Sequence, residues 1–89
     1  AVGAEIDLVL ELPGNQLWAV EIKRSSAPTL SKGFHIACGD LAATRRLVVS
    51  SANARFPMAG SAEHLPLLAL MHELLLLGQS HSVHFTGSS

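Results

Sequence analysis

In two short runs near the start of the chain, large apolar residues alternate with residues that are mostly charged. In the run 5–12, which reads Glu-Ile-Asp-Leu-Val-Leu-Glu-Leu, every second residue is a large aliphatic one. In the run 17–23, Trp18, Val20 and Ile22 alternate with Ala19, Glu21 and Lys23. A period of two is typical of half-buried strands. Between the runs, Pro13-Gly14-Asn15-Gln16 is a turn signal, so we expect a β-hairpin.

The pattern changes to helical spacing in residues 30–43, after a polar connector over 24–29. Apolar residues recur there at steps of three or four, at Leu30, Phe34, Ala37, Cys38 and Leu41, which predicts an amphipathic helix. Residues 45–51 then contain the continuous apolar run Leu47-Val48-Val49, which is typical of a buried central strand. A strand–helix–strand unit implies a parallel pair joined by a crossover.

The last third of the chain predicts mainly a second helix. Residues 53–61 are expected to form a loop, and 64–66 a short edge strand. Pro66 suits the first turn of a helix that would run to Leu77 and stop at Gly78. This helix is apolar nearly all round, so both of its sides need cover. We expect one mixed α/β domain over 1–78 and a flexible tail over 79–89.

The composition fits a small domain that hides surface against a partner. With 89 residues, the chain is long enough for one domain. Hydrophobic residues make up 48% and charged residues 15%, against a typical charged share of about 25%. Such a chain is too apolar for disorder. It is also apolar for a domain that stands alone, which predicts a homodimer or a piece of a larger protein.

Charge and cysteine content exclude some classes of protein. A formal net charge of −1 excludes a nucleic-acid binder that relies on a strongly basic surface. A single cysteine excludes an intramolecular disulfide framework and suits the reducing cytoplasm. The apolar stretch 65–77 is too short to span a bilayer, so we expect no membrane partner.

The hairpin brings acidic and basic side chains together. Glu5 and Asp7 share one face of the first strand, and Glu21 and Lys23 share one face of the second. If Asp7 lies opposite Glu21, Glu5 lies opposite Lys23. This register requires either a hairpin loop with an odd number of residues, such as the three residues Pro13-Gly14-Asn15, or a bulge in the ladder. Cross-strand neighbours have Cβ atoms about 4.5–5.5 Å apart. We therefore expect two carboxylates and an ammonium group to converge.

Such a set matches metal-dependent phosphodiester hydrolysis. A divalent cation of the Mg²⁺ type prefers oxygen ligands, often one or two carboxylates with waters and phosphate oxygens. Asp7 and Glu21 would supply the carboxylates, and the backbone carbonyl of Ile22 a third oxygen. Lys23 would orient or help to deprotonate the attacking water, or stabilise charge on the phosphate. The alternative reading of the same residues is a solvated hairpin face with stabilising ion pairs.

The sequence resembles a known superfamily over roughly residues 3–77. The segments 5–11, 18–25 and 30–38 look like the core of the PD-(D/E)XK nucleases. They most resemble the restriction-endonuclease-like C-terminal domain of bacterial AAA-type ATPases of uncharacterised function. The resemblance implies a mixed sheet built from a β-hairpin, a helix, a parallel strand and a C-terminal helix, and a domain truncated at its N-terminus, where a preceding helix is missing.

The same resemblance implies roles for individual residues. Asp7 takes the first acidic position of the motif, Glu21 the second and Lys23 the lysine, with Mg²⁺ or Mn²⁺ as the cofactor. Glu5 occupies a place that is often acidic, and Ile6 stands where the motif has proline. No Walker-type phosphate loop occurs in this chain, so the ATPase module would be a separate part of the full-length protein. The alternatives are a non-catalytic accessory or interaction domain of such an ATPase and an α/β fragment with no site.

Two further groups of residues are candidates for binding. Arg24, Ser25 and Lys32 follow the second strand and could grip the phosphate backbone of a nucleic acid, or form a solvated connector in which Ser31 or Thr29 caps the helix. His35, Cys38, His81 and His84 could together form a zinc site, and Cys38 could form a nucleophilic pair with His35, three residues before it. Alternatively, Cys38 packs in the core as a free thiol.

Overall fold

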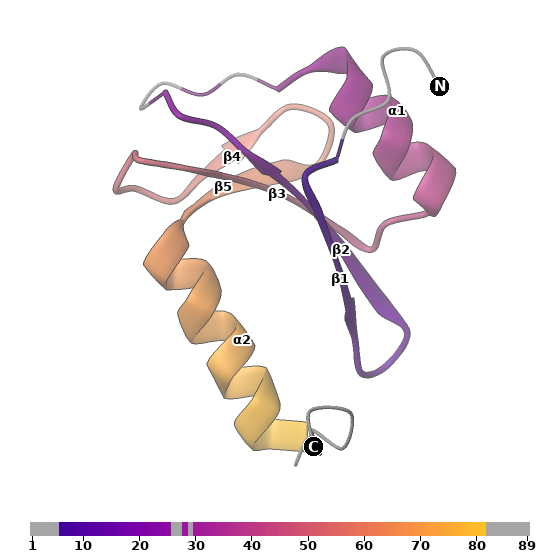
Figure 1. Cartoon of the computed structure of the whole chain (residues 1–89), viewed down its shortest axis with the longest axis vertical. Helices are drawn as coiled ribbons and strands as arrows, with labels where there is room; N and C mark the ends of the chain where they lie inside the picture. The colour runs from indigo at the N-terminus through magenta and orange to yellow at the C-terminus, as the bar shows by residue number, and fades with distance from the viewer. Residues whose placement is uncertain (1–5, 26–27, 29, 82–89) are drawn as a thin grey trace.

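The computed structural model describes residues 6–25, 28 and 30–81, with the side chains of residues 79–81 left out. It is a mixed α/β fold with a five-stranded sheet in the order β1-β2-β3-β5-β4 (Figure 1). The elements in chain order are β1 (Leu8–Leu12), β2 (Gln16–Ile22), α1 (Lys32–Leu41), β3 (Arg45–Ser50), β4 (Phe56–Met58), β5 (Ala62–Pro66) and α2 (Leu67–His81).

The predicted hairpin is confirmed, and so is the parity of its loop. β1 and β2 pair antiparallel from Leu8 opposite Val20 to Leu12 opposite Gln16. The loop therefore holds three residues, Pro13 to Asn15. Gly14 and Asn15 have φ angles of +80° and +60°, a left-handed conformation that these two residue types adopt at the lowest cost.

The strand–helix–strand unit is also confirmed. α1 begins at the N-cap Ser31, whose hydroxyl accepts the Phe34 N–H at 3.0 Å. The helix ends at Ala42, which has a left-handed φ of 54° and donates its N–H to the carbonyls of Cys38 and Gly39. Both caps pair backbone groups that the ends of a helix otherwise leave unpaired. After the helix, β3 pairs in parallel with β2, with Trp18 opposite Arg45 and Glu21 opposite Val48.

The sequence interpretation was wrong about the far edge of the sheet. Residues 56–58, expected in a loop, form β4, and β5 lies between β3 and β4 rather than at the edge. The edge position explains why β4 tolerates Pro57, because proline cannot donate a hydrogen bond to a neighbouring strand. Its three residues, one of which is proline, carry too little alternation to identify it as a strand.

The boundaries of the second helix also differ from the prediction. Pro66 is the last residue of β5, where it pairs with Ser50, and α2 starts at Leu67. The helix continues past Gly78 to His81. A single glycine costs about 1 kcal/mol relative to alanine and does not by itself end a helix, so the expected stop at Gly78 is wrong.

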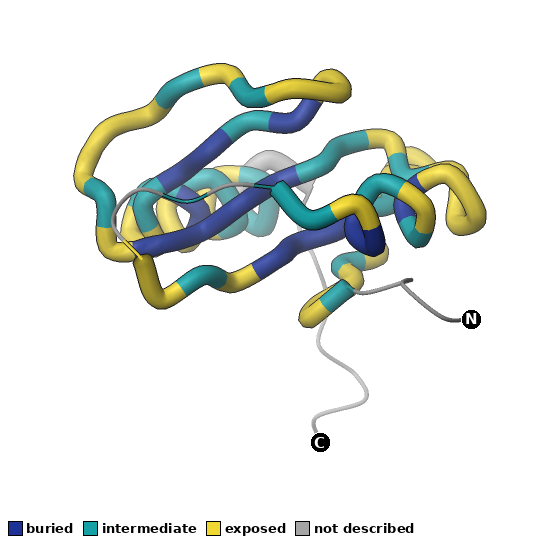
Figure 2. The backbone as a smooth tube through the Cα atoms, turned by 90° about the horizontal axis from the view of Figure 1, so that it is seen from above, coloured by how far each residue is buried: buried dark blue, intermediate teal, exposed yellow. Residues whose placement is uncertain are grey.

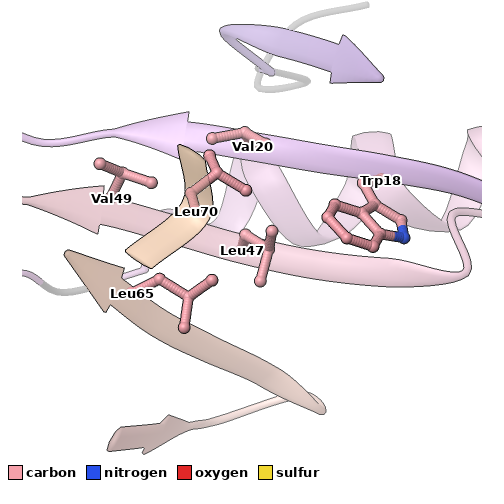
Figure 3. Packing of buried hydrophobic residues seen from close by; sticks show 6 residues of the cluster. All are labelled: Trp18, Val20, Leu47, Val49, Leu65 and Leu70. Carbon is pink, nitrogen blue, oxygen red and sulfur yellow. The ribbon is translucent and has the colours of Figure 1, made fainter. Parts of the chain in front are cut away.

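The two helices cover opposite faces of the sheet (Figure 1), and each face has its own apolar core. The larger core lies between the sheet and α2, with partly buried Leu10, Leu12, Ala69, Leu74 and Leu77 around it. Figure 3 shows its centre, made of Trp18, Val20, Leu47, Val49, Leu65 and Leu70. The smaller core packs Ala19 against Phe34 and Cys38 of α1. The longest buried runs of the described chain consequently lie in β2, at residues 18–21, and in β3, at residues 47–50 (Figure 2).

The second helix is covered on one side within this chain. Leu70 is buried and Leu74 is half-buried against the sheet. The opposite side is open, with exposed large side chains at Leu67, Leu68, Met71, Leu75 and Leu76, of which Leu68 keeps 77% of its surface accessible. We expected both sides of this helix to need cover. The sheet covers one side, and the side with these five residues is exposed.

Candidate functional site

Glu21 is the centre of the polar group on the α1 face of the sheet. It lies near the end of β2 and keeps only 5% of its surface accessible. Its Oε2 accepts a hydrogen bond from the Ser31 hydroxyl at 3.1 Å and forms an ion pair with Lys23 Nζ at 3.1 Å. The alternation of the strand therefore brings Glu21 and Lys23 side by side, as predicted.

The other oxygen of the same carboxylate is left without a partner. Glu21 Oε1 is buried and has no hydrogen-bond partner among the described residues. A buried polar atom with no partner costs about 1–3 kcal/mol, and more when it carries charge. Glu21 therefore holds one oxygen that is anchored by Ser31 and Lys23 and one buried oxygen that has no partner among the described residues.

Asp7 is attached to the same end of β2 through the backbone. Its N–H donates to the Val20 carbonyl at 3.1 Å, and its Oδ2 accepts the Ile22 N–H at 2.7 Å. The regular pairing of β1 with β2 stops at Leu8 opposite Val20. Beyond that point the Asp7 side chain, and not a backbone carbonyl, accepts the Ile22 N–H. Asp7 is thus held beside the residue that follows Glu21, and the Glu5–Lys23 pairing falls outside the described residues.

The flanking basic and hydroxyl residues lie on the connector into α1. Arg24, Ser25 and Lys32 are all exposed. Lys32 is the first residue of α1, directly after the Ser31 that contacts Glu21. The sequence analysis identified Ser31 as a capping candidate but missed its bond to Glu21, because nothing in a linear pattern shows that a cap also reaches a neighbouring strand.

A second buried polar pair lies further along the same face. His64 is fully buried, and the register aligns it with Val48 and, one strand further, with Glu21. His64 Nδ1 lies 2.8 Å from the Ala54 carbonyl, and Nε2 lies 2.7 Å from Ser50 Oγ. A carbonyl only accepts, so Nδ1 donates to the Ala54 carbonyl. In the neutral ring, Nε2 then accepts from the Ser50 hydroxyl.

This histidine pair was not identified from the sequence. Ser50 Oγ also accepts the Ala52 N–H at 3.1 Å, and Phe56 stacks on the His64 ring with centroids 4.6 Å apart. Every polar atom of the pair has a partner, which is typical of a buried polar network that orders its surroundings. The pair holds the turn after β3 against β4 and β5.

The soft-ligand candidates do not come together in the described residues. Cys38 is buried in the smaller core, and burial raises the pKa of its thiol above the ordinary value of 9.0. The His35 ring lies directly against Gly60, so that a Cβ atom at position 60 would clash with His35 Cε1. The side chains of His81 and His84 lie outside the described residues. Among those that are described, no three His, Cys, Asp or Glu residues form a metal-binding group.

Of the predicted cation ligands, the structure leaves Asp7 and Glu21 as two candidate carboxylates at the same end of β2. Asp7 and Glu21 would provide oxygen ligands, and the rest of the coordination shell would come from water and phosphate oxygens. This shortage of protein ligands suits Mg²⁺, which keeps several waters when it binds proteins. It does not suit a structural zinc site, which normally has four protein ligands.

Comparison with known proteins identifies the family. Residues 1–70 match a family that is described as a domain of unknown function, DUF4143. The chain belongs to the DUF4143 family. The match covers both strands of the hairpin, α1, β3, β4, β5 and the start of α2, so the candidate site lies within the family domain.

The relatives are bacterial proteins and are much longer than the matched region. "Uncharacterized protein Mb2031c" of Mycobacterium bovis and "Uncharacterized protein Rv2008c" of Mycobacterium tuberculosis are each 36% identical to this chain over 63 residues. That region is 71% of this chain and 14% of each relative. No solved structure matches the chain. Within the described residues, no helix is long and apolar enough to cross a membrane.

Proposed function

We propose that this domain is a PD-(D/E)XK nuclease-like module that hydrolyses phosphodiesters of nucleic acid with Mg²⁺ or Mn²⁺. Asp7 and Glu21 would hold the cation, with the Ile22 carbonyl as a further oxygen. Lys23 would act on the attacking water or the phosphate, and Arg24, Ser25 and Lys32 would contact the substrate backbone.

One observation supports this proposal above the others, namely the unpartnered oxygen of Glu21. Glu21 Oε1 is buried with no partner among the described residues, while Oε2 of the same group is held by Ser31 and Lys23. A carboxylate with one anchored and one unsatisfied oxygen is preorganised for a ligand, since its rotamer is already fixed. A solvated hairpin face would expose both oxygens to water instead of burying one.

Charge balance favours a cation at the same place. Asp7 and Glu21 carry two negative charges against the single positive charge of Lys23. A divalent ion would offset this excess of one negative charge and leave one positive charge for a phosphate oxygen, and it would activate a bound water and polarise the phosphoryl group. Lys23 forms an ion pair with Glu21 at 3.1 Å and would stabilise negative charge on the phosphate. In the reaction, the water oxygen forms a bond to phosphorus, the opposite P–O bond breaks, and the leaving oxygen takes a proton.

Metal binding is the first test of the proposal. We expect isothermal titration of the whole chain with Mn²⁺ to show binding that falls at least tenfold in Glu21→Gln and in Asp7→Asn. Glu11→Gln is the matched control, because Glu11 lies four residues from Asp7, about 13 Å along the strand. Equal affinity in the wild type, Asp7→Asn and Glu21→Gln would contradict the metal site.

Cleavage is the second test. We expect the wild-type chain to cleave mixed DNA and RNA substrates with Mn²⁺ or Mg²⁺, and Lys23→Met to lose about 100-fold or more in rate, the size of a typical acid–base or electrostatic contribution. Mn²⁺ affinity should persist in Lys23→Met, because the lysine is not a ligand. Cleavage that survives Lys23→Met undiminished would contradict the assigned role.

A second candidate function is an accessory or interaction domain of a longer AAA-type ATPase. Two observations favour it: the open apolar side of α2, and the fact that the matched region is 14% of each mycobacterial relative. Under this proposal the partners are the ATPase module of the full-length protein or a second copy of the domain, in the cytoplasm.

Sedimentation and ATP hydrolysis test this second candidate. A homodimer through α2 should dissociate in Leu68→Glu, whereas Glu11→Gln should leave it intact. In a longer family member, deleting this domain should change the rate of ATP hydrolysis. A wild-type monomer, together with an unchanged ATPase rate, would contradict both forms of the interaction proposal.

A further inference from the structure

A pocket lies at the opposite end of α1 from Glu21, where β3 begins. Its volume is about 340 Å³, and it is lined by Ala43, Thr44, Arg45, Arg46, Gly60 and Ser61. These residues come from the connector after α1, the start of β3 and the loop between β4 and β5. A volume in this range is sufficient for a small ligand.

Arg46 is the unusual residue of this pocket. The half-buried cationic side chains of the described residues are Lys23, Arg45 and Arg46. Lys23 pairs with Glu21, and Arg45 pairs with Glu63 and Glu73. Arg46 forms no ion pair with any described residue, and its guanidinium donates a long hydrogen bond of 3.4 Å to the Gly60 carbonyl. It therefore keeps most of its donors for a ligand.

The electrostatics of the pocket favour an anion. The charge of Arg45 is already balanced by Glu63 and Glu73, so Arg46 gives the pocket a net positive charge. The carbonyl end of α1 would oppose an anion. However, the Cys38 and Gly39 carbonyls accept the N–H groups of Ala42 and Ala43, which reduces that effect.

The shape of the donors points to a phosphate group. We propose that the pocket around Arg46 binds the terminal phosphate of a small molecule. The Arg46 guanidinium offers a fork of N–H donors that matches phosphate oxygens, and the Ser61 hydroxyl lines the same pocket. A phosphate monoester presents three terminal oxygens and can use donors from several directions. The remaining volume would hold the rest of the ligand.

Phosphate binding and its position are measured together by amide and arginine Nε NMR shifts of the whole chain. The probes are phenyl phosphate, inorganic phosphate and the diester dimethyl phosphate, at physiological salt so that exposed cations are screened. We expect phenyl phosphate to shift the signals of Arg46, Gly60 and Ser61, inorganic phosphate to bind more weakly at the same residues, and the diester to bind at least tenfold more weakly than phenyl phosphate.

Matched arginine variants separate this site from general charge attraction. Arg46→Gln should weaken the binding of phenyl phosphate at least tenfold and Arg46→Lys several-fold, whereas Arg55→Gln, at an exposed arginine outside the pocket lining, should change the affinity less than twofold. Shifts centred on Arg24 and Lys32, equal binding of the diester, or unchanged affinity in Arg46→Gln would each overturn the proposal. Because none of these readouts uses Asp7, Glu21 or a metal, the result is independent of the proposed nuclease function.

Discussion

Two ionic clusters lie on opposite faces of the sheet and differ in how fully their hydrogen-bonding capacity is used. On the α2 face, Arg45 donates to Glu63 at 2.6 and 2.9 Å and to Glu73 at 2.7 and 3.1 Å. Its guanidinium carbon also lies 4.5 Å from the centre of the Trp18 ring. On the α1 face, Glu21 has one satisfied and one unsatisfied oxygen.

This difference separates a structural cluster from a candidate site. The Arg45 cluster joins β3, β5 and α2, and its side chains have 22–34% of their surface accessible. Water can therefore bind the polar atoms of this cluster that lack a protein partner. Glu21 is more deeply buried and less completely paired, an arrangement that reduces stability unless a ligand completes it. Unused polar capacity in a buried group is therefore the feature that marks the α1 face.

The largest loss of stability is expected from Arg45→Ala. Among the described residues, the substitution leaves Glu63 and Glu73 with only the longer contacts to Arg55, at 3.7 and 3.4 Å. It also removes the cation from the Trp18 ring. We expect a decrease of about 2–3 kcal/mol in the free energy of unfolding, measured by urea denaturation. A decrease below about 0.5 kcal/mol would place this cluster among ordinary surface ion pairs.

Ser31→Ala should have the next largest effect, on the opposite face. The loss of the N-cap costs about 1 kcal/mol, and Glu21 loses one of its two donors. Ser31→Thr is the matched control, because it retains the hydroxyl. Urea denaturation measures the stability, and Mn²⁺ titration should show weaker binding in Ser31→Ala than in Ser31→Thr. Equal stability and affinity in the two variants would show that the hydroxyl does not position Glu21.

Acid should weaken the α2 face through Glu73. The hydrogen bond from Arg45 holds the pKa of Glu73 below its ordinary value of 4.5. A depressed folded-state pKa means that this stabilisation is present above pH 4.5 and is lost as the pH falls from there through the folded-state value. We expect a contribution of about 1 kcal/mol. Urea midpoints at a series of acidic pH values should fall more steeply for the wild type than for Glu73→Gln.

The smallest change in stability is expected from Glu21→Gln. The substitution removes the ion pair with Lys23, which lowers stability. It also removes the cost of a buried anionic oxygen without a partner, which raises stability. The two effects should nearly cancel. We expect a change within about 0.5 kcal/mol in metal-free buffer, in either direction. A loss as large as that in Arg45→Ala would show that Glu21 is a structural group like its counterpart on the other face.

Much of the fold could be predicted from local patterns. Alternation predicted the hairpin and its three-residue loop, and apolar spacing predicted α1. β4 could not be found in this way, because a three-residue edge strand containing Pro57 has too few alternating positions. The continuation of α2 past Gly78 also escaped prediction, since the cost of one glycine is smaller than the gain from the surrounding turns.

The candidate site, like the fold, could be predicted from the sequence only in part. The sequence by itself determined that Glu21 and Lys23 share a strand face and that the hairpin register brings Asp7 to the same end of β2, because side-chain alternation is a property of any strand. Tertiary structure alone decided that Ser31 anchors Glu21, that Glu21 Oε1 is buried without a partner, that His64 binds Ser50, and that Arg46 lines a pocket free of carboxylates. The physical reason is that burial and hydrogen-bond satisfaction depend on which distant segments pack together, and no local pattern along the chain encodes that arrangement.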